Sequence, residues 1–203
     1  MKKNIQQAVM AMALIMAALM PLIGCQSTAT PVSGTLARAT STPTATATVP
    51  TALIIFDDSL HVATGESEFD GGGVSTSSDL ADTSSPYAGS VDAIWVYSSC
   101  GSYVGWNVTG PSTDLSAYTT LSFWAKVNRA YTGSGIEFFG GGNSVSPNHL
   151  FAVTTTYQQY SYTFNQPSNN TTIFFGTVIN GTDVSDLPGA GPITVYVDNI
   201  QYQ

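Results

Sequence analysis

The sequence predicts an all-β protein, either an antiparallel β-sandwich or a jelly roll. Short runs rich in Val, Ile, Thr and aromatic residues follow one another, and clusters of Gly, Ser, Asn and Pro separate them. Helical periodicity is nearly absent, so no segment is long enough to serve as a helical crossover between parallel strands. These two observations favour a sandwich and disfavour doubly wound and barrel α/β folds.

The strands are expected after residue 51. Side chains alternate between the two faces of a strand, so residues of one parity share a face. The predicted strands are 53–57, 91–98, 102–109, 119–127, 135–140, 149–155, 158–164, 171–179 and 193–202.

Alternation places several large aromatic side chains on faces that we expect to point away from the core. Trp106 shares its parity with Val104 and Val108 and is therefore predicted to be buried. A face that combines several aromatic rings with a few polar groups is unusual for a solvated sheet. We expect this outer set to be Trp95, Tyr97, Trp124 and Phe139, mixed with Lys126 and Glu137.

The N-terminus has the anatomy of a secretory signal. Lys2 and Lys3 precede an apolar run of about fifteen residues, which is too short to span a membrane. The cysteine that follows Leu22-Ile23-Gly24 resembles the bacterial lipobox, in which the thiol is acylated. We therefore predict a signal peptide at 1–24 and a lipid on Cys25, which would anchor the protein at the bacterial cell surface or outer membrane. An ordinary signal peptide with an incidental cysteine is the alternative.

Composition divides the remaining chain into a tether and one domain. Residues 25–51 are rich in Thr, Ser and Pro and lack aromatic residues, so they cannot bury enough apolar surface to fold. Residues 52–203 are sufficient for one hydrophobic core. All thirteen acidic residues lie in this domain with only Lys126 and Arg129, which disfavours nucleic acid as a partner. Cys100 is the single cysteine of the domain, so the domain cannot contain an internal disulfide. We expect the protein to be a monomer.

Three segments of the domain form an ordered set of motifs. The domain opens with Leu53-Ile54-Ile55-Phe56-Asp57-Asp58 and closes with Val195-Tyr196-Val197-Asp198-Asn199-Ile200. Between them lies Leu121-Ser122-Phe123-Trp124-Ala125-Lys126. In this order the motifs resemble the galactose-binding-like jelly rolls, and most closely the carbohydrate-binding modules of the β-glucan-binding kind.

The resemblance implies a concave sheet that binds a polysaccharide and a structural calcium ion that joins the two chain ends. It places Tyr97 and Trp124 in the cleft. It places Asp57, Asp58 and Asp198 where the opening and closing acids of that family lie. This chain departs from the family in two places, because no Trp follows the opening acids and residues 165–170 lack a longer charged loop.

Aromatic faces suit sugars because pyranose rings present axial C–H groups that pack on a π surface, while polar neighbours bind the hydroxyls. The candidate carbohydrate-binding residues are therefore Trp95, Tyr97, Trp124 and Glu137. The alternatives are that the aromatic rings pack in the core or at an interface, and that Glu137 is a solvated strand residue.

Calcium is the expected cofactor because it binds six to eight hard oxygen ligands. The jelly-roll topology brings the first and last strands together, so the carboxylates of Asp57, Asp58 and Asp198 would repel one another unless a cation lay between them. The alternative is that each acid simply ends a strand or caps a turn.

Catalysis is not expected. Glu66-Ser67-Glu68-Phe69-Asp70 superficially resembles the alternating acids of some β-glucanases, and a retaining mechanism needs two carboxyl groups about 5–5.5 Å apart. The three glycines that follow, and the absence of β-branched residues between the acids, predict a loop that cannot hold them in place. His61 and His149 are isolated, and no nucleophile elbow, HExxH motif or P-loop occurs.

The sequence therefore predicts a surface-anchored lipoprotein with a non-catalytic module that binds a β-glucan-like polysaccharide. Three other classes stay open: a glycoside hydrolase or lyase of jelly-roll fold, a protein-binding adhesion domain, and an accessory domain that has lost its ligand.

Overall fold

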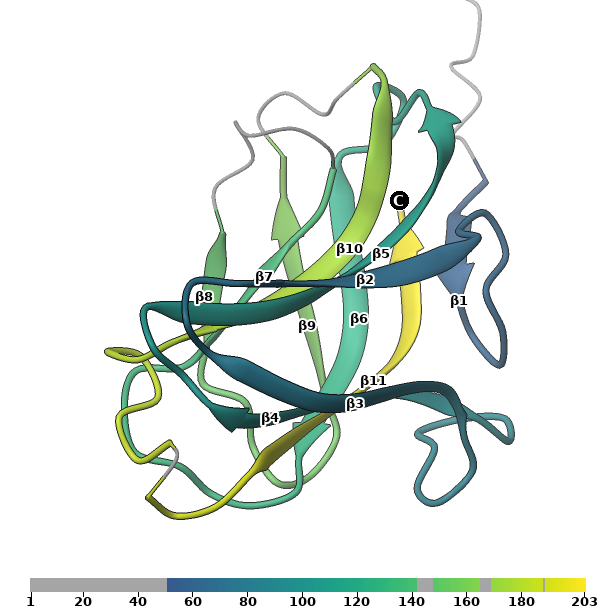
Figure 1. Ribbon diagram of the computed structural model, residues 1–203. Coiled ribbons are helices and arrows are strands. Elements are labelled where there is room, and N and C mark those ends of the chain that lie inside the picture. Colours follow the sequence, from purple (N-terminus) through teal and green to yellow (C-terminus); the bar gives the residue numbers. More distant parts are fainter. Residues whose placement is uncertain (1–50, 142–147, 165–168, 188) are drawn as a thin grey trace, which may run out of the picture. The chain divides into compact units, whose positions relative to one another are not determined.

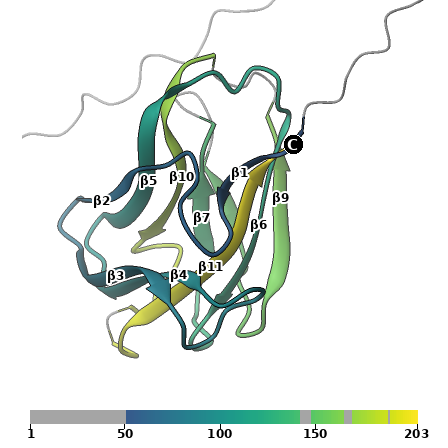
Figure 2. The ribbon, with the colours of Figure 1, turned by 90° about the vertical axis from the view of Figure 1, so that its right-hand side faces the viewer.

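The computed structural model describes residues 51–141, 148–164, 169–187 and 189–203, all within the compact unit Thr46–Gln203. The predicted signal peptide, Cys25 and the tether up to residue 50 lie outside the described residues. The described chain forms two antiparallel sheets that face one another, as two perpendicular views show (Figures 1 and 2). The prediction of an all-β sandwich is confirmed. Among the described residues, no helix is long and apolar enough to cross a membrane.

One sheet has six strands. Its strands run in the order β3-β4-β11-β6-β9, and β1 pairs with β11 beside this path. The strands are β1 (Leu53–Phe56), β3 (Val74–Asp82), β4 (Asp92–Ser99), β6 (Thr120–Val127), β9 (Gln158–Thr163) and β11 (Ile193–Tyr202).

The other sheet has five strands in the order β2-β5-β10-β7-β8. The long strands β5 and β10 lie at its centre and pair along most of their length. The strands are β2 (Gly65–Asp70), β5 (Tyr103–Thr113), β7 (Ile136–Phe139), β8 (His149–Phe151) and β10 (Thr171–Asn180).

The first and last strands lie side by side (Figure 1). Leu53 of β1 pairs with Tyr202 of β11, and Phe56 pairs with Ile200. A register shift separates Asp198 from Gln201 where β11 meets β6, and Asn199 there has a φ of 48°. Asn tolerates this left-handed conformation better than most residues do.

All the predicted strands are present, but the prediction for residues 66–70 is wrong. These residues form β2 rather than a loop, because β2 pairs with β5 over its whole length, from Gly65↔Thr109 to Asp70↔Val104. The following strand, β3, was not predicted either. Both strands are rich in Ser, Asp and Glu, so local propensity gives little sign of them, and cross-strand pairing determines their conformation.

The core lies between the two sheets and is rich in aromatic rings. Phe123 of β6 packs against Phe138 of β7 with ring centroids 4.6 Å apart, and Trp95 of β4 packs against Phe175 of β10 at 6.1 Å. The prediction that Trp124 and Lys126 of β6, and Glu137 and Phe139 of β7, point away from the core is confirmed, because the residues that alternate with the first of these sets include the buried Phe123 and Ala125 and the second alternates with Phe138. Leu121, Phe123, Ala125 and Val127 are buried in β6, and Ile136 and Phe138 are buried in β7.

The prediction that Trp95 and Tyr97 lie on an outer face is wrong. Both side chains are fully buried, and the polar atom of each finds a partner on the five-stranded sheet. Trp95 Nε1 donates to Glu66 Oε2 at 3.1 Å, and the Tyr97 hydroxyl is hydrogen-bonded to the hydroxyl of Thr177. Alternation could not decide between the faces of β4, because Ile94 and Val96 make its other face equally apolar. Trp106 packs against the core as predicted, although it is only half-buried.

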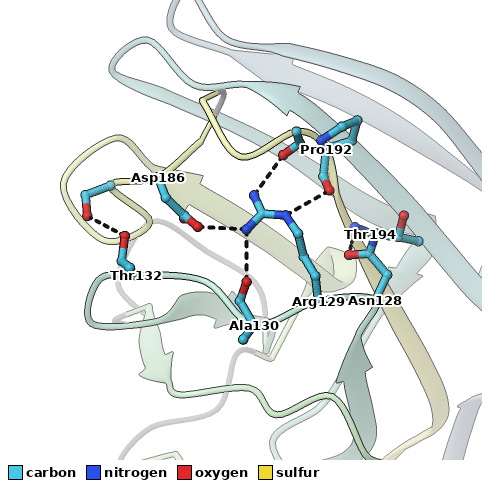
Figure 3. A network of polar contacts seen from close by, with 9 residues as sticks. Asn128, Arg129, Ala130, Thr132, Asp186, Pro192 and Thr194 are labelled. Atoms are coloured by element: carbon cyan, nitrogen blue, oxygen red, sulfur yellow. Dashed lines mark hydrogen bonds and ion pairs between the residues drawn. The ribbon is translucent and has the colours of Figure 1, made fainter.

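Arg129 joins the segment that follows β6 to the segment that precedes β11 (Figure 3). Its Nη1 donates to Asp186 Oδ2 at 2.7 Å and its Nη2 donates to the carbonyl of Gly191 at 2.7 Å. Further bonds run from Nη1 to the carbonyl of Ala130 and from Nε to that of Pro192. Burial opposes ionisation of Asp186, but the hydrogen bond and charge of Arg129, together with backbone hydrogen bonds, outweigh it and keep the pKa of this carboxyl below its ordinary value. The network holds the segment between β10 and β11 in place.

Candidate functional site

A groove of about 470 Å³ lies on the outer face of the five-stranded sheet. Its residues come from β2, β5, β7 and β10 and from the residue before β8. Along β10 they extend from Ile173 to Asn180, seven steps of the strand, which corresponds to about 23 Å at roughly 3.3 Å per residue. The groove is lined by Phe69, Tyr103, Asn107, Phe139, Asn148, Ile173, Val178 and Asn180.

Two glycines on the central strands leave room for aromatic rings from the neighbouring strands to lie over the backbone at the bottom of the groove. Phe69 of β2 pairs with Gly105 of β5, and Phe139 of β7 pairs with Gly176 of β10. A methyl group added at either glycine would collide with the paired ring. Because the central strands carry no side chain at these points, the rings meet over them at 5.8 Å, edge to face.

Tyr103 extends this aromatic surface. Its ring lies 6.3 Å from that of Phe69, and 40% of the residue is exposed. The groove therefore presents three aromatic rings, two of them half-buried and one open to solvent. Such a surface can pack against the C–H face of a ring-shaped ligand.

Three asparagine amides supply most of the polar groups of the groove, and each is held by a neighbouring side chain. Asn148 Nδ2 donates to Glu137 Oε2 at 2.6 Å, and Asn180 Nδ2 donates to Asp183 Oδ2 at 3.1 Å. Asn107 Oδ1 instead accepts a hydrogen bond from the Ser67 hydroxyl at 2.8 Å. Asn148 and Asn180 thus keep their carbonyl oxygen for a ligand, while Asn107 keeps its N–H donors.

The two basic residues of the domain lie away from the groove. Arg129 is committed to Asp186 and to carbonyl groups. The Lys126 ammonium lies over the rings of Tyr157 and Tyr196, 4.6 Å from each centroid, on the outer face of the six-stranded sheet. The groove is consequently lined by neutral residues, with the carboxylates of Glu137 and Asp183 directly behind two of them.

The predicted carbohydrate-binding residues are not brought together. Trp95 and Tyr97 lie in the core, and Trp124 lies on the outer face of the other sheet, where Tyr87 stacks on it at 3.8 Å. Only Glu137 lies on the groove side, where it contacts Asn148. Phe139 was placed on the correct face by alternation, and Tyr103 has the parity opposite to Trp106. Phe69 is not among the predicted residues, because the sequence predicts a loop where the structure has β2.

The three acids predicted to bind calcium have other partners. Asp57 Oδ1 is 2.6 Å from His61 Nε2, and Asp58 Oδ1 accepts the backbone N–H groups of Ser90 and Val91 at 2.6 and 2.9 Å. Asp198 Oδ2 accepts those of Tyr87 and Ala88 at 3.1 and 3.0 Å. The N–H groups of Ser90 and Val91 lower the pKa of Asp58, whereas burial raises that of Asp198.

These acids therefore fit a calcium ion poorly. Backbone N–H donors already occupy oxygen atoms of Asp58 and Asp198 that a cation would need. Within the ranges that the structure describes, no three His, Cys, Asp or Glu side chains lie close enough together to hold a metal ion. Instead, Asp58 and Asp198 hold the segment 83–91 against the outer face of the six-stranded sheet. Calcium binding stays a prediction from the sequence.

A second polar cluster lies beneath this segment. Asp92 is fully buried, and its Oδ2 accepts a hydrogen bond of 2.5 Å from the Tyr157 hydroxyl. Burial, together with the neighbouring carboxylate of Asp82, raises the pKa of Asp92 to about 6. Lys126 reaches the same region and donates to the carbonyl of Ser85 at 3.3 Å.

The acids of β2 do not face the groove. Glu66 Oε1 accepts from the Ser78 hydroxyl at 2.5 Å, and its Oε2 accepts from Trp95. Glu68 Oε1 accepts from the backbone of Ser75 at 3.3 Å. Both side chains point toward the six-stranded sheet, while Ser67 and Phe69 face the groove. The alternating acids are therefore held on a strand, contrary to the prediction, but on the face opposite to the groove.

Comparison with known proteins gives matches among solved structures; no family model and no curated protein matches the chain. A family 11 carbohydrate-binding module from Clostridium thermocellum, in complex with a β-1,3-1,4-mixed-linked tetrasaccharide, is 12% identical with a TM-score of 0.49. The match covers 74% of this chain and 94% of that module. A point mutant of a family 29 carbohydrate-binding module, complexed with cellulohexaose, is 12% identical with a TM-score of 0.43. This match covers 75% of this chain and 89% of that one. Another point mutant of the same module, complexed with mannohexaose, is 11% identical with a TM-score of 0.43. This match covers 75% of this chain and 90% of that one.

Proposed function

We propose that this chain is a non-catalytic carbohydrate-binding protein whose groove holds a polysaccharide. The observation that carries the proposal is the combination, in one groove, of three aromatic rings and three oriented amides. Sugar rings offer C–H groups to an aromatic face and hydroxyl groups to amide donors and acceptors. The residues that line the groove extend over about 23 Å along β10, a length that suits an extended sugar chain better than a single sugar.

We further propose that the protein is a lipoprotein, anchored through Cys25 at the bacterial surface or outer membrane and joined to the groove domain by the tether 25–51. The apolar run that ends in Leu22-Ile23-Gly24 supports this part of the proposal. Such an arrangement would keep an extracellular glycan near the cell.

The test is affinity electrophoresis of the full chain in gels that contain mixed-linked β-glucan, glucomannan or hydroxyethylcellulose. Tyr103→Ala removes the exposed ring of the groove. Tyr87→Ala is a matched control, because both tyrosines are 40% exposed and Tyr87 stacks on Trp124 of the other sheet. Loss of one ring from an aromatic platform costs on the order of 1–3 kcal/mol, by analogy with stacking on other planar ligands. We expect Tyr103→Ala to abolish the retardation and Tyr87→Ala to keep it.

The opposite result would transfer the binding surface to the outer face of the six-stranded sheet, where Tyr87 stacks on Trp124, one of the residues predicted from the sequence. Circular dichroism of both variants checks that the fold is retained. If none of the three gels retards the parent protein, the proposed function is wrong.

A further inference from the structure

We propose that the groove selects uncharged glycans and rejects acidic ones, and that Glu137 and Asp183 are the residues that determine this selectivity. The inference rests on the proposed function, because it names the class of glycan that the same groove accepts. It concerns two carboxylates that do not line the groove themselves but bind the amides that do.

Each carboxylate determines which atom its asparagine presents to a ligand. Glu137 Oε2 accepts from Asn148 Nδ2 at 2.6 Å, and Asp183 Oδ2 accepts from Asn180 Nδ2 at 3.1 Å. A carboxylate only accepts hydrogen bonds, so both amides must turn their nitrogen toward it and their carbonyl oxygen away from it. The groove consequently offers acceptors at these two positions. A hydroxyl group can donate to them, whereas an ionised carboxylate of a uronic acid cannot.

The same two carboxylates make the groove electronegative. Asp183 also accepts a hydrogen bond of 3.1 Å from the Ser134 hydroxyl, which fixes its side chain beside Asn180. Among the described residues no basic side chain lines the groove, since Lys126 is held by Ser85 and tyrosine rings, and Arg129 is paired with Asp186. An acidic sugar would therefore meet two like charges and no counter-charge from these residues. Asn107 is oriented the other way, because its oxygen accepts from Ser67 and its N–H groups are presented to the groove.

The experiment compares each neutral polymer with its own oxidised form. Mixed-linked β-glucan and glucomannan are used as such and after oxidation of their C6 hydroxyls to carboxylates, so the backbone is unchanged and only the charge differs. Binding of the full chain is measured by affinity electrophoresis at about 10 mM and about 500 mM salt, where the Debye length falls from about 30 Å to a few Å. We expect binding of the oxidised form to be at least tenfold weaker at low salt and to recover partly at high salt.

The variants Glu137→Gln and Asp183→Asn remove the charge and keep an oxygen that can accept from Asn148 or Asn180. Each should raise the affinity for the oxidised polymer at least threefold relative to the affinity for the neutral polymer, so the ratio of the two affinities is the readout. Asp79→Asn is the matched control, because Asp79 is an exposed acid on β3 of the other sheet. It should change neither affinity.

Equal binding of the neutral and oxidised forms overturns this inference and leaves the proposed function intact. Discrimination that persists unchanged at high salt and in both variants also overturns it, because the cause would then be the shape of the groove. Failure of the parent protein to bind either neutral polymer overturns both proposals.

Discussion

Replacing Asp92 with Asn should stabilise the protein at neutral pH. Asp92 is fully buried under the segment 83–91, and its pKa is raised from 3.8 to about 6 by burial and by its neighbour Asp82. A raised carboxyl pKa favours the folded state at low pH, and this stability is lost as pH rises through the folded pKa. The loss is complete above about pH 6 and amounts to at most about 3 kcal/mol, since one pKa unit corresponds to about 1.4 kcal/mol.

Asn at this position keeps an oxygen that can accept the hydrogen bond from the Tyr157 hydroxyl. It also carries N–H donors, in the way that a protonated Asp92 carries one O–H donor. We therefore expect Asp92→Asn to increase the free energy of unfolding by about 1–3 kcal/mol at pH 7.5 and by almost nothing at pH 4. For a domain of this size the corresponding rise in melting temperature at pH 7.5 is about 4–10 °C.

The assay is thermal and urea unfolding of the parent and the variant between pH 4 and pH 8. Asp79→Asn is the control, because this exposed acid is hydrogen-bonded locally, to the backbone of Ala81. Tyr157→Phe should act in the opposite sense, destabilising the protein more at pH 7.5 than at pH 4. A stabilisation by Asp92→Asn that did not depend on pH, or a destabilisation at pH 7.5, would refute the reasoning.

Four further predictions test other parts of the structure. Arg129→Ala should lower the free energy of unfolding by about 2 kcal/mol, measured by urea unfolding, because it leaves Asp186 and three carbonyl groups without their donor; an unchanged stability would show that the network contributes nothing. Gly176→Ala should displace the Phe139 ring and weaken glycan binding at least tenfold in affinity gels while the β-rich circular dichroism is retained; normal binding would show that the ring is not part of the platform. Excess calcium and excess chelator should give the same melting temperature, because Asp58 and Asp198 already accept backbone N–H groups, whereas a rise in calcium would support the prediction from the sequence. Cys25→Ser should move the protein from the membrane fraction to the soluble fraction, and retention in the membrane would show that the anchor lies elsewhere.

The sandwich was predictable because most strands carry a clear alternation of apolar and polar side chains. In β6 the buried set Leu121, Phe123, Ala125 and Val127 alternates with Ser122, Trp124 and Lys126, so its faces could be assigned without a structure. β4 offered no such contrast, since Ala93, Trp95 and Tyr97 on one face oppose Ile94 and Val96 on the other. Its assignment depended on which face met the second sheet, which is a tertiary property.

The groove was predictable only in part. Alternation placed Phe139 and Glu137 on the correct face of β7. The role of Gly105 and Gly176 could not be predicted, because it depends on which residue stands opposite each glycine on the neighbouring strand. The partners of Asp58 and Asp198 are backbone groups about 30 and 110 residues away along the chain, and no local pattern indicates them.

The pairing of β1 with β11 determines how the domain would respond to mechanical load. An anchored protein that holds a polymer is pulled at residue 52 and at the groove, and the first structured element that meets this force is β1, a strand of only four residues. We expect β1 to peel from β11 before any other strand separates and to draw Asp58 away from Ser90 and Val91. The groove belongs to the other sheet, so separation of β1 would leave the residues that line it in place.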